Sequence, residues 1–252
     1  MSERRVAPHG AWKSPITSDL IVSGTVGLGQ IVIDGENIYW TEMRPSEAGR
    51  NCVVRHRPDG WMRDETLPRF NARTRVHEYG GGAYAVVDGT VYFSNFADQR
   101  VYCESPEKPP RPLTPAVDLR YADFAFDRGR SRLIAVREDH TAEGREAVNS
   151  VVSLAVDDDG AEGADAGTDR VPNPDGGRVL VLGHDFYSSP RLSPDGSRLA
   201  WLAWNHPNMP WDGCELWVAA LENPEDMRRV AGGPGESIWQ PDWSPAGELH
   251  FV

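Results

Sequence analysis

Apolar and polar residues alternate in short runs along almost the whole chain, and helical periodicity is nearly absent. The runs are bounded by Asp-Gly, Pro and Asn, which is typical of β-strands joined by tight turns. In one recurring unit, a short strand leads into a turn centred on aspartate, and a more apolar strand follows. The copies are I-V-I-D-G-E-N-I-Y-W (31–40), A-V-V-D-G-T-V-Y-F-S (85–94), F-A-F-D-R-G-R-S-R-L-I-A-V (124–136), R-L-S-P-D-G-S-R-L-A-W-L (191–202) and D-W-S-P-A-G-E-L-H-F-V (242–252).

The spacing of these turns predicts the architecture. Successive turns are between about 39 and 68 residues apart, and they are centred on Asp34, Asp88, Asp127, Asp195 and Ala246. Asp and Gly accept the left-handed backbone angles of tight hairpins, and each interval has room for four short strands. Such a repeat is typical of a β-propeller blade. We therefore predict an all-β propeller of four blades plus the start of a fifth, with an incomplete ring.

The end of the chain and its longest interval each add an expectation. The fifth copy stops inside its second strand, so residues 1–252 are expected to be the N-terminal part of a longer propeller domain. Residues 157–177 are rich in Asp and Gly and almost lack large apolar side chains, which predicts a mobile surface insertion. They do not fit a calcium loop, because Ala161 breaks the D-x-D-x-D-G register.

Charge and cysteine content exclude several classes of protein. The chain has 38 acidic and 26 basic residues, a formal charge of −12, and no basic run, so nucleic acid and anionic membranes are not expected partners. Its three cysteines are widely spaced, which favours free thiols in a reducing compartment. The N-terminus has no apolar signal region and no long apolar run occurs, so a cytoplasmic location is expected. No metal and no cofactor are expected, because the seven histidines lack ligand-like spacing.

The stretch R-V-H-E-Y-G-G-G-A-Y (75–84) places a histidine and a glutamate beside three glycines. A phosphate cradle would need a helix after the glycines, and here a strand follows. We expect the glycines to let an innermost strand enter a crowded channel. His77 is interpreted as a packed, hydrogen-bonded residue, and a ligand contact is the alternative because innermost strands line the channel.

Motifs of hydrolytic catalysis are absent from the sequence. A nucleophile elbow, G-x-S-x-G, does not occur, and its nearest approach, G-E-S-I-W (235–239), lacks the second glycine. H-E-x-x-H and the P-loop motif are also missing. The chain by itself is therefore expected not to hydrolyse peptides.

Several long stretches carry a family resemblance. They are R-T-R-V-H-E-Y-G-G-G-A-Y (73–84), Y-F-S-N-F-A-D-Q-R (92–100), G-H-D-F-Y-S-S-P-R-L-S-P-D-G (183–196) and N-H-P-N-M-P-W-D-G-C-E-L-W (205–217). They resemble the N-terminal propeller of S9 (prolyl oligopeptidase) serine peptidases, in the dipeptidyl aminopeptidase/acylaminoacyl peptidase branch. The resemblance implies a propeller that gates access of short peptides to a C-terminal α/β-hydrolase domain. That domain, not present here, would supply the Ser-Asp-His triad.

The resemblance also implies candidate substrate-binding residues. Some members of the family hold the free amine of the substrate with propeller carboxylates, through charge-assisted hydrogen bonds. Glu78 in R-V-H-E-Y and Glu138 in R-E-D-H are the candidates here. The alternative is that each glutamate pairs with a nearby arginine, such as Arg75 or Arg137.

Two other functions remain open from the sequence. One is a stand-alone propeller that acts as a protein-binding scaffold, of the TolB or WD40 kind. The other is a propeller hydrolase with its own metal site in the channel.

Overall fold

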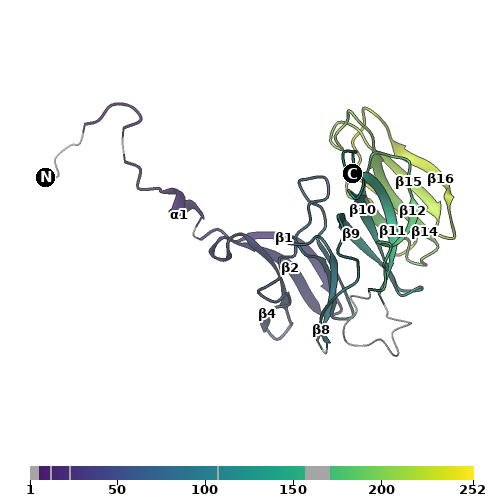
Figure 1. Ribbon diagram of the computed structural model, residues 1–252, viewed down its shortest axis with the longest axis horizontal. Helices are drawn as coiled ribbons and strands as arrows, with labels where there is room; N and C mark the ends of the chain where they lie inside the picture. Colours follow the sequence, from purple (N-terminus) through teal and green to yellow (C-terminus); the bar gives the residue numbers. More distant parts are fainter. Residues whose placement is uncertain (1–5, 12, 23, 107, 157–170) are drawn as a thin grey trace.

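The computed structural model describes residues 6–11, 13–22, 24–106, 108–156 and 171–252. Four antiparallel sheets of four strands and one two-stranded sheet follow one another along the chain (Figure 1). We call the four-stranded sheets blades 1 to 4. The two-stranded sheet is the start of a fifth blade, and the sheets do not close into a ring. The predicted all-β propeller of four blades plus the start of a fifth, with an incomplete ring, is therefore confirmed.

Each blade is an antiparallel meander in chain order. The strands of blades 1 and 2 are β1 (Gly27–Asp34), β2 (Asn37–Arg44), β3 (Arg50–His56), β4 (Met62–Asp64), β5 (Tyr84–Val87), β6 (Thr90–Ser94), β7 (Val101–Ser105) and β8 (Lys108–Pro112). Those of blades 3 and 4 are β9 (Leu119–Asp127), β10 (Arg132–Asp139), β11 (Val148–Ala155), β12 (Arg178–Val181), β13 (Phe186–Leu192), β14 (Arg198–Trp204), β15 (Glu215–Ala220) and β16 (Asn223–Gly232). The two-stranded sheet consists of β17 (Asp242–Trp243) and β18 (Leu249–His250).

Helical structure is confined to two short segments of the described chain, α1 (Ser18–Val22) and a 3-10 turn (Pro45–Glu47). No helix among the described residues is long and apolar enough to cross a membrane.

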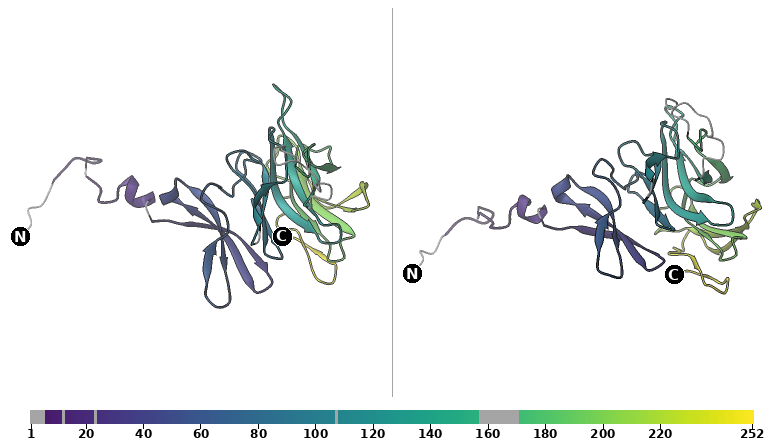
Figure 2. Two further views of the ribbon diagram at one scale, coloured as in Figure 1. Left: turned by 60° about the horizontal axis from the view of Figure 1, so that its bottom comes forward. Right: turned by 90° about the horizontal axis from the view of Figure 1, so that it is seen from below.

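The first strand of every blade is the innermost one. Strand β5 contacts β1 and β9, and β13 contacts β9 and β17, so neighbouring blades meet along their first strands. The remaining strands of each blade step outward in chain order. Figure 2 shows the blades following one another through the molecule from purple to yellow.

The hydrophobic core consists of clusters that lie between neighbouring blades. Strand β10 shows how they form, because its run L-I-A-V is buried on both faces. Leu133 and Ala135 belong to the cluster with blade 2, whereas Ile134 and Val136 belong to the cluster with blade 4. Successive side chains of a strand point to opposite faces, so a blade covered on both sides has a continuous apolar run.

The aspartates of the hairpin turns act mainly as hydrogen-bond acceptors. Only Asp88 has a left-handed backbone, with φ 50°. The carboxylate of Asp34 accepts the backbone N–H groups of Asp88 and Gly89 at 3.1 and 2.8 Å, which ties the first turn to the second. Asp195 accepts the N–H of Ser197 within its own turn. The expected positions of the turns are therefore confirmed, but the left-handed angles fall mostly on the neighbouring glycines.

Bulges in the innermost strands tie the blades together. Gln30, Asp123 and Ser189 all have left-handed backbones, at φ 40°, 56° and 54°, inside β1, β9 and β13. Each coincides with a register shift against the second strand of its blade. The Asp123 carboxylate accepts the N–H of Gly82 from blade 2 at 2.5 Å and the N–H of Ser189 from blade 4 at 2.9 Å. One side chain thus joins three blades.

The glycines before β5 permit this close approach. A Cβ atom on Gly82 would lie 2.9 Å from Asp123 Oδ1, and one on Gly81 would lie 3.1 Å from the Cβ of Ala122. The expected need for a small residue is therefore real, but the crowding comes from the neighbouring innermost strand, β9.

Only the last part of the predicted surface insertion, 157–177, can be compared with the structure, because residues 157–170 lie outside the described residues. Val171 and Asn173 are buried. The amide of Asn173 donates to the carbonyls of Leu113 and Ala155, at 2.9 and 3.0 Å. Residues 171–177 therefore pack between blades 2 and 3, and a mobile loop stays a prediction for 157–170.

A carboxyl group between blades 1 and 2 should make stability depend on pH. Burial raises the pKa of Glu104 on β7 to about 7, with a further contribution from the charge of Glu65. Between pH 4.5 and 7 the folded chain therefore keeps a proton on Glu104 that the unfolded chain releases. The free energy of unfolding consequently falls as pH rises through this range. We expect Glu104→Gln to stabilise the fold at pH 8 by about 1–2 kcal/mol, a value reduced for solvent screening.

Urea unfolding of Glu104→Gln at pH 5 and pH 8 measures this effect. The gain should be clearly larger at pH 8, whereas Glu225→Gln, an exposed position on β16, should change little at either pH. The same gain for Glu104→Gln at both values would contradict the assignment.

Candidate ligand-binding site

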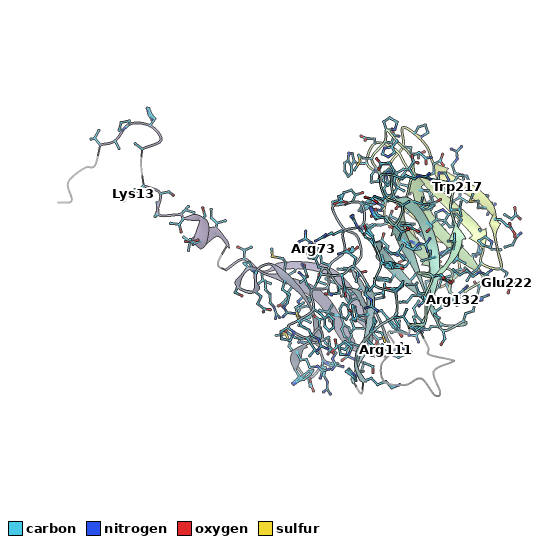
Figure 3. The ribbon with its side chains drawn as sticks, viewed as in Figure 1. Lys13, Arg73, Arg111, Arg132, Trp217 and Glu222 are labelled. Atoms are coloured by element: carbon cyan, nitrogen blue, oxygen red, sulfur yellow. The ribbon has the colours of Figure 1, made fainter. Side chains whose placement is uncertain are left out.

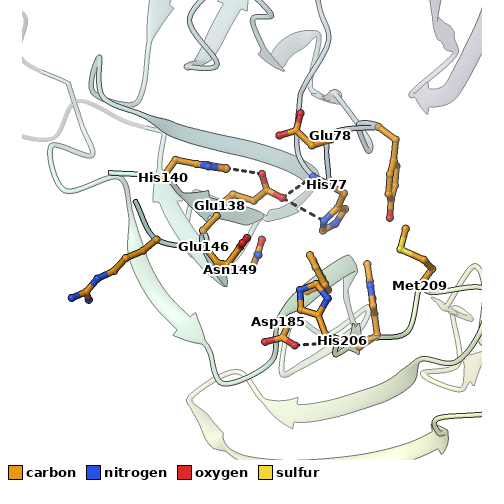
Figure 4. Close-up of a pocket in the computed structure, with 14 residues that line it drawn as sticks. His77, Glu78, Glu138, His140, Glu146, Asn149, Asp185, His206 and Met209 are labelled. Atoms are coloured by element: carbon orange, nitrogen blue, oxygen red, sulfur yellow. Dashed lines mark hydrogen bonds and ion pairs between the residues drawn. The ribbon is translucent and has the colours of Figure 1, made fainter. Parts of the chain in front are cut away.

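A cavity of about 430 Å³ lies between the ends of blades 3 and 4, beside the turn that precedes β5 (Figure 4). Its walls come from that turn, from the end of β10 and the loop after it, and from the facing ends of β13 and β14. The lining residues are His77, Glu78, Tyr79, Glu138, His140, Arg145, Glu146, Ala147, Asn149, Asp185, Phe186, Trp204, His206 and Met209. Both sequence-predicted site residues, Glu78 and Glu138, are among them.

Strand pairing places Glu138 at the centre of a polar row. It is opposite Arg120 on β9 and opposite Asn149 on β11. The backbone N–H of His77 donates to its Oε1 at 2.6 Å, and His140 Nε2 lies 3.1 Å from its Oε2. His140 follows directly after β10 and lies two residues from Glu138, a spacing that places both side chains on the same side of the extended chain. The carboxylate is therefore fixed from several directions.

Glu138 is buried and yet held in its charged form. Its exposed fraction is 4%, and the Arg120 guanidinium lies 3.7 Å from its Oε2. Burial raises the pKa of Glu138, but hydrogen bonds from His77 and His140 outweigh burial and bring the pKa below its usual value. The carboxyl group is thus ionised at neutral pH, which is expensive in a buried site unless charged or polar partners surround it.

Glu78 lies at the mouth of the cavity, with 77% of its side chain exposed. Its Oε1 is 2.5 Å from Arg120 Nη1, so one arginine faces both glutamates. The expected arginine partners were Arg75 and Arg137, and the structure assigns this role to Arg120 instead. Register explains the difference, because Arg120 is the cross-strand neighbour of Glu138.

The turn that holds Glu78 is built from unusual backbone angles. His77 and Glu78 are both left-handed, at φ 58° and 63°, which is uncommon for residues with a side chain. His77 Nε2 donates to the carbonyl of Tyr187 at 2.9 Å, and Arg120 Nη1 donates to that of Arg75 at 3.3 Å. His77 is therefore a packed, hydrogen-bonded residue, as the sequence suggested, and it also lines the cavity.

The opposite wall of the cavity is aromatic. Phe186 and Trp204 are stacked with ring centroids 5.5 Å apart, and His206 meets Phe186 edge-on at 4.9 Å. The Oδ1 of Asn149 is buried and has no hydrogen-bond partner among the described residues. A buried carboxylate, a free amide oxygen and aromatic faces together suit a cation attached to an apolar group.

The sequence singled out the two glutamates that line this cavity but not three residues that lie beside them, His140, Arg120 and Asn149. His140 stood in the quoted R-E-D-H stretch, and its spacing of two from Glu138 was the available signal. Arg120 and Asn149 join the site through strand register, for which the sequence contains no direct signal.

Extensive matches among solved structures include two puromycin-hydrolysing peptidases. Puromycin hydrolase is 37% identical, with a TM-score of 0.80 over 96% of this chain and 38% of that chain. A Mycobacterium tuberculosis puromycin-hydrolyzing peptidase is also 37% identical, with a TM-score of 0.81 over 99% of this chain and 39% of that one. The chain therefore spans less than two fifths of either peptidase.

More distant matches share the fold alone. TolB from Acinetobacter baumannii is 12% identical, with a TM-score of 0.54 over 88% of this chain and 47% of its own. A prolyl endopeptidase is also 12% identical, with a TM-score of 0.55 over 90% of this chain and 34% of its own. No protein-family model and no curated protein matches the sequence. From its likeness to the two puromycin-hydrolysing peptidases, the chain belongs to the S9, or prolyl oligopeptidase, family of peptidases, and it corresponds to the β-propeller of that family.

Proposed function

We propose that this chain is the non-catalytic propeller portion of an S9 serine peptidase. In the whole protein it admits short peptides to an α/β-hydrolase domain and binds their free N-terminal amine at Glu138. The likeness to peptidases more than twice as long supports a companion domain. The cavity supports the ligand class, because about 430 Å³ suits a small molecule or a few peptide residues.

The observation that carries this proposal is the buried, ionised carboxylate of Glu138 in an open cavity. Arg120 faces both Glu78 and Glu138, and its single positive charge balances one of the two carboxylates. These three side chains together therefore keep one negative charge, which matches one ammonium group. An N-terminal ammonium has three N–H donors. Glu138 and the unpartnered Oδ1 of Asn149 offer it acceptors, and the Phe186–Trp204 wall lies opposite for the apolar part of the first residue.

Blocking the amine of a peptide tests the proposal. We expect the purified chain to bind Ala-Ala-Ala at least about tenfold more tightly than N-acetyl-Ala-Ala-Ala, because the neutral amide leaves the Glu138 carboxylate without a charged partner. Titrations followed by NMR or calorimetry measure both affinities at neutral pH. Equal affinity for the two peptides would show that the cavity does not select a free amine.

A further inference from the structure

A second cavity lies beside the cavity that contains Glu138, and the two share one lining residue. Its volume is about 240 Å³, and residues of blades 1 and 2 line it, among them Gln30, Asn51 and Arg73. Tyr79 lines both cavities and therefore stands between them. Arg73 lies where blades 1 and 2 meet (Figure 3).

Arg73, which lines this second cavity, shares an aromatic partner with Arg75, two residues further along the chain. The guanidinium carbons of Arg73 and Arg75 lie 4.9 and 4.5 Å from the ring centroid of Phe96. Both side chains are exposed, and neither has an ion-pair partner in the described part of the chain. The net charge of the whole chain is −12, and arginines such as Arg44 and Arg120 are ion-paired. The positive charge at Phe96 thus lacks a counter-ion.

The backbone around this pair holds it in place. The N–H of Arg73 donates to the carbonyl of Ser94 at 3.0 Å, and the N–H of Phe96 donates to the carbonyl of Asn71 at 2.9 Å. The N–H of Arg75 donates to the buried Gln99 side chain at 2.8 Å. Both arginines and their aromatic partner therefore sit on two segments that are hydrogen-bonded to each other.

Such an arrangement is chemically suited to an anion. Two guanidinium groups on one ring repel each other, and a bound anion removes the repulsion. The planar fork of arginine donates two parallel N–H groups to a carboxylate, and stacking on an aromatic face limits the entropy lost on binding. A carboxylate or another oxyanion is thus the matching ligand.

We infer that Arg73 and Arg75 receive the C-terminal carboxylate of the short peptide whose ammonium group is held at Glu138. This inference rests on the proposed function and names its substrate class, which is short peptides with both ends free. The peptide would pass Tyr79, which borders both cavities. Since an extended chain spans at most about 3.3–3.6 Å per residue, the two charged sites would also limit peptide length.

Amidation of the peptide's C-terminus tests the inference. The probes are Ala-Ala-Ala and its C-terminal amide, titrated against the unaltered chain and against an Arg73→Gln/Arg75→Gln double variant. We expect amidation to weaken binding about tenfold in the unaltered chain, as for loss of a charge-assisted hydrogen bond, and to have no effect in the double variant. Arg69→Gln is the matched control, because Arg69 also stacks on a phenylalanine, Phe70 at 5.0 Å, and it should keep the tenfold preference.

The outcomes separate this inference from the proposed function. If N-acetylation weakens binding but amidation does not, the carboxylate site is wrong and the amine site stands. If the double variant keeps the preference for the free acid, the assignment to Arg73 and Arg75 is overturned. If N-acetylation has no effect, the proposed function itself fails. Circular dichroism of each variant confirms that the fold is retained before the titrations are compared.

Discussion

Glu138→Gln is expected to weaken binding of Ala-Ala-Ala to this chain by about 100-fold. The substitution keeps the size of the side chain but removes the negative charge that the ammonium group meets. Truncating or neutralising one partner of a buried, hydrogen-bonded charge pair typically costs about 2–5 kcal/mol, which corresponds to roughly 30-fold or more. Gln can still accept the N–H of His77, so the turn that carries Glu78 should keep its position.

Two further variants make this result specific. Glu146→Gln removes an exposed carboxylate from the same cavity and should change affinity less than about threefold, because exposed charges are screened. Glu78→Gln should have an intermediate effect, since Glu78 is exposed but shares Arg120 with Glu138. Calorimetric or NMR titration of all three variants gives the order. A Glu138→Gln chain that binds as well as the Glu146→Gln chain would remove Glu138 from the binding site.

Asp123→Ala is expected to lower the free energy of unfolding by about 3–4 kcal/mol. The substitution leaves the half-buried N–H groups of Gly82 and Ser189 without their acceptor, and each costs about 1 kcal/mol or somewhat more, the lower end of the range for buried groups. It also places alanine at a φ of 56°, which adds about 1 kcal/mol of backbone strain. Blade 3 would then lose a polar link to both of its neighbours.

Chemical denaturation of the variant and its controls measures this loss. Asp123→Asn keeps one acceptor oxygen and tolerates the left-handed backbone, so it should cost about half as much. Asp118→Ala, at an exposed aspartate just before β9, should cost less than about 0.5 kcal/mol. A loss for Asp123→Ala no larger than that for Asp118→Ala would show that the Asp123 carboxylate does not hold the blades together.

The sequence predicted the fold well because the responsible signals are local. Each hairpin has its own turn residues and its own alternation of apolar side chains, so the copies at 31–40 and 191–202 reveal a blade before any contact between blades is known. The same signals do not show how the sheets meet. The clusters between blades, with Ile134 and Leu133 on opposite faces of β10, follow only from three-dimensional packing.

The site was predictable in part, for a physical reason. Glu78 lies inside a stretch that carries the family resemblance, whereas Glu138 lies in R-E-D-H (137–140), outside those stretches, and became a candidate only because the resemblance implies propeller carboxylates. Arg120 joins them through the pairing of β9 with β10, and a slip of one residue would have turned it to the other face. The left-handed angle of His77 runs against the ordinary preference of a bulky side chain, so no propensity argument could have anticipated it.

The order of the strands has a consequence for how the molecule is made. Every blade is a meander of consecutive strands, and the innermost bulges bond only to adjacent blades. A chain leaving the ribosome can therefore complete one blade before the next has been synthesised, and each finished blade presents a surface on which the following one condenses. Folding by this route needs few encounters between remote parts of the polypeptide, which favours speed over the usual slowness of all-β proteins.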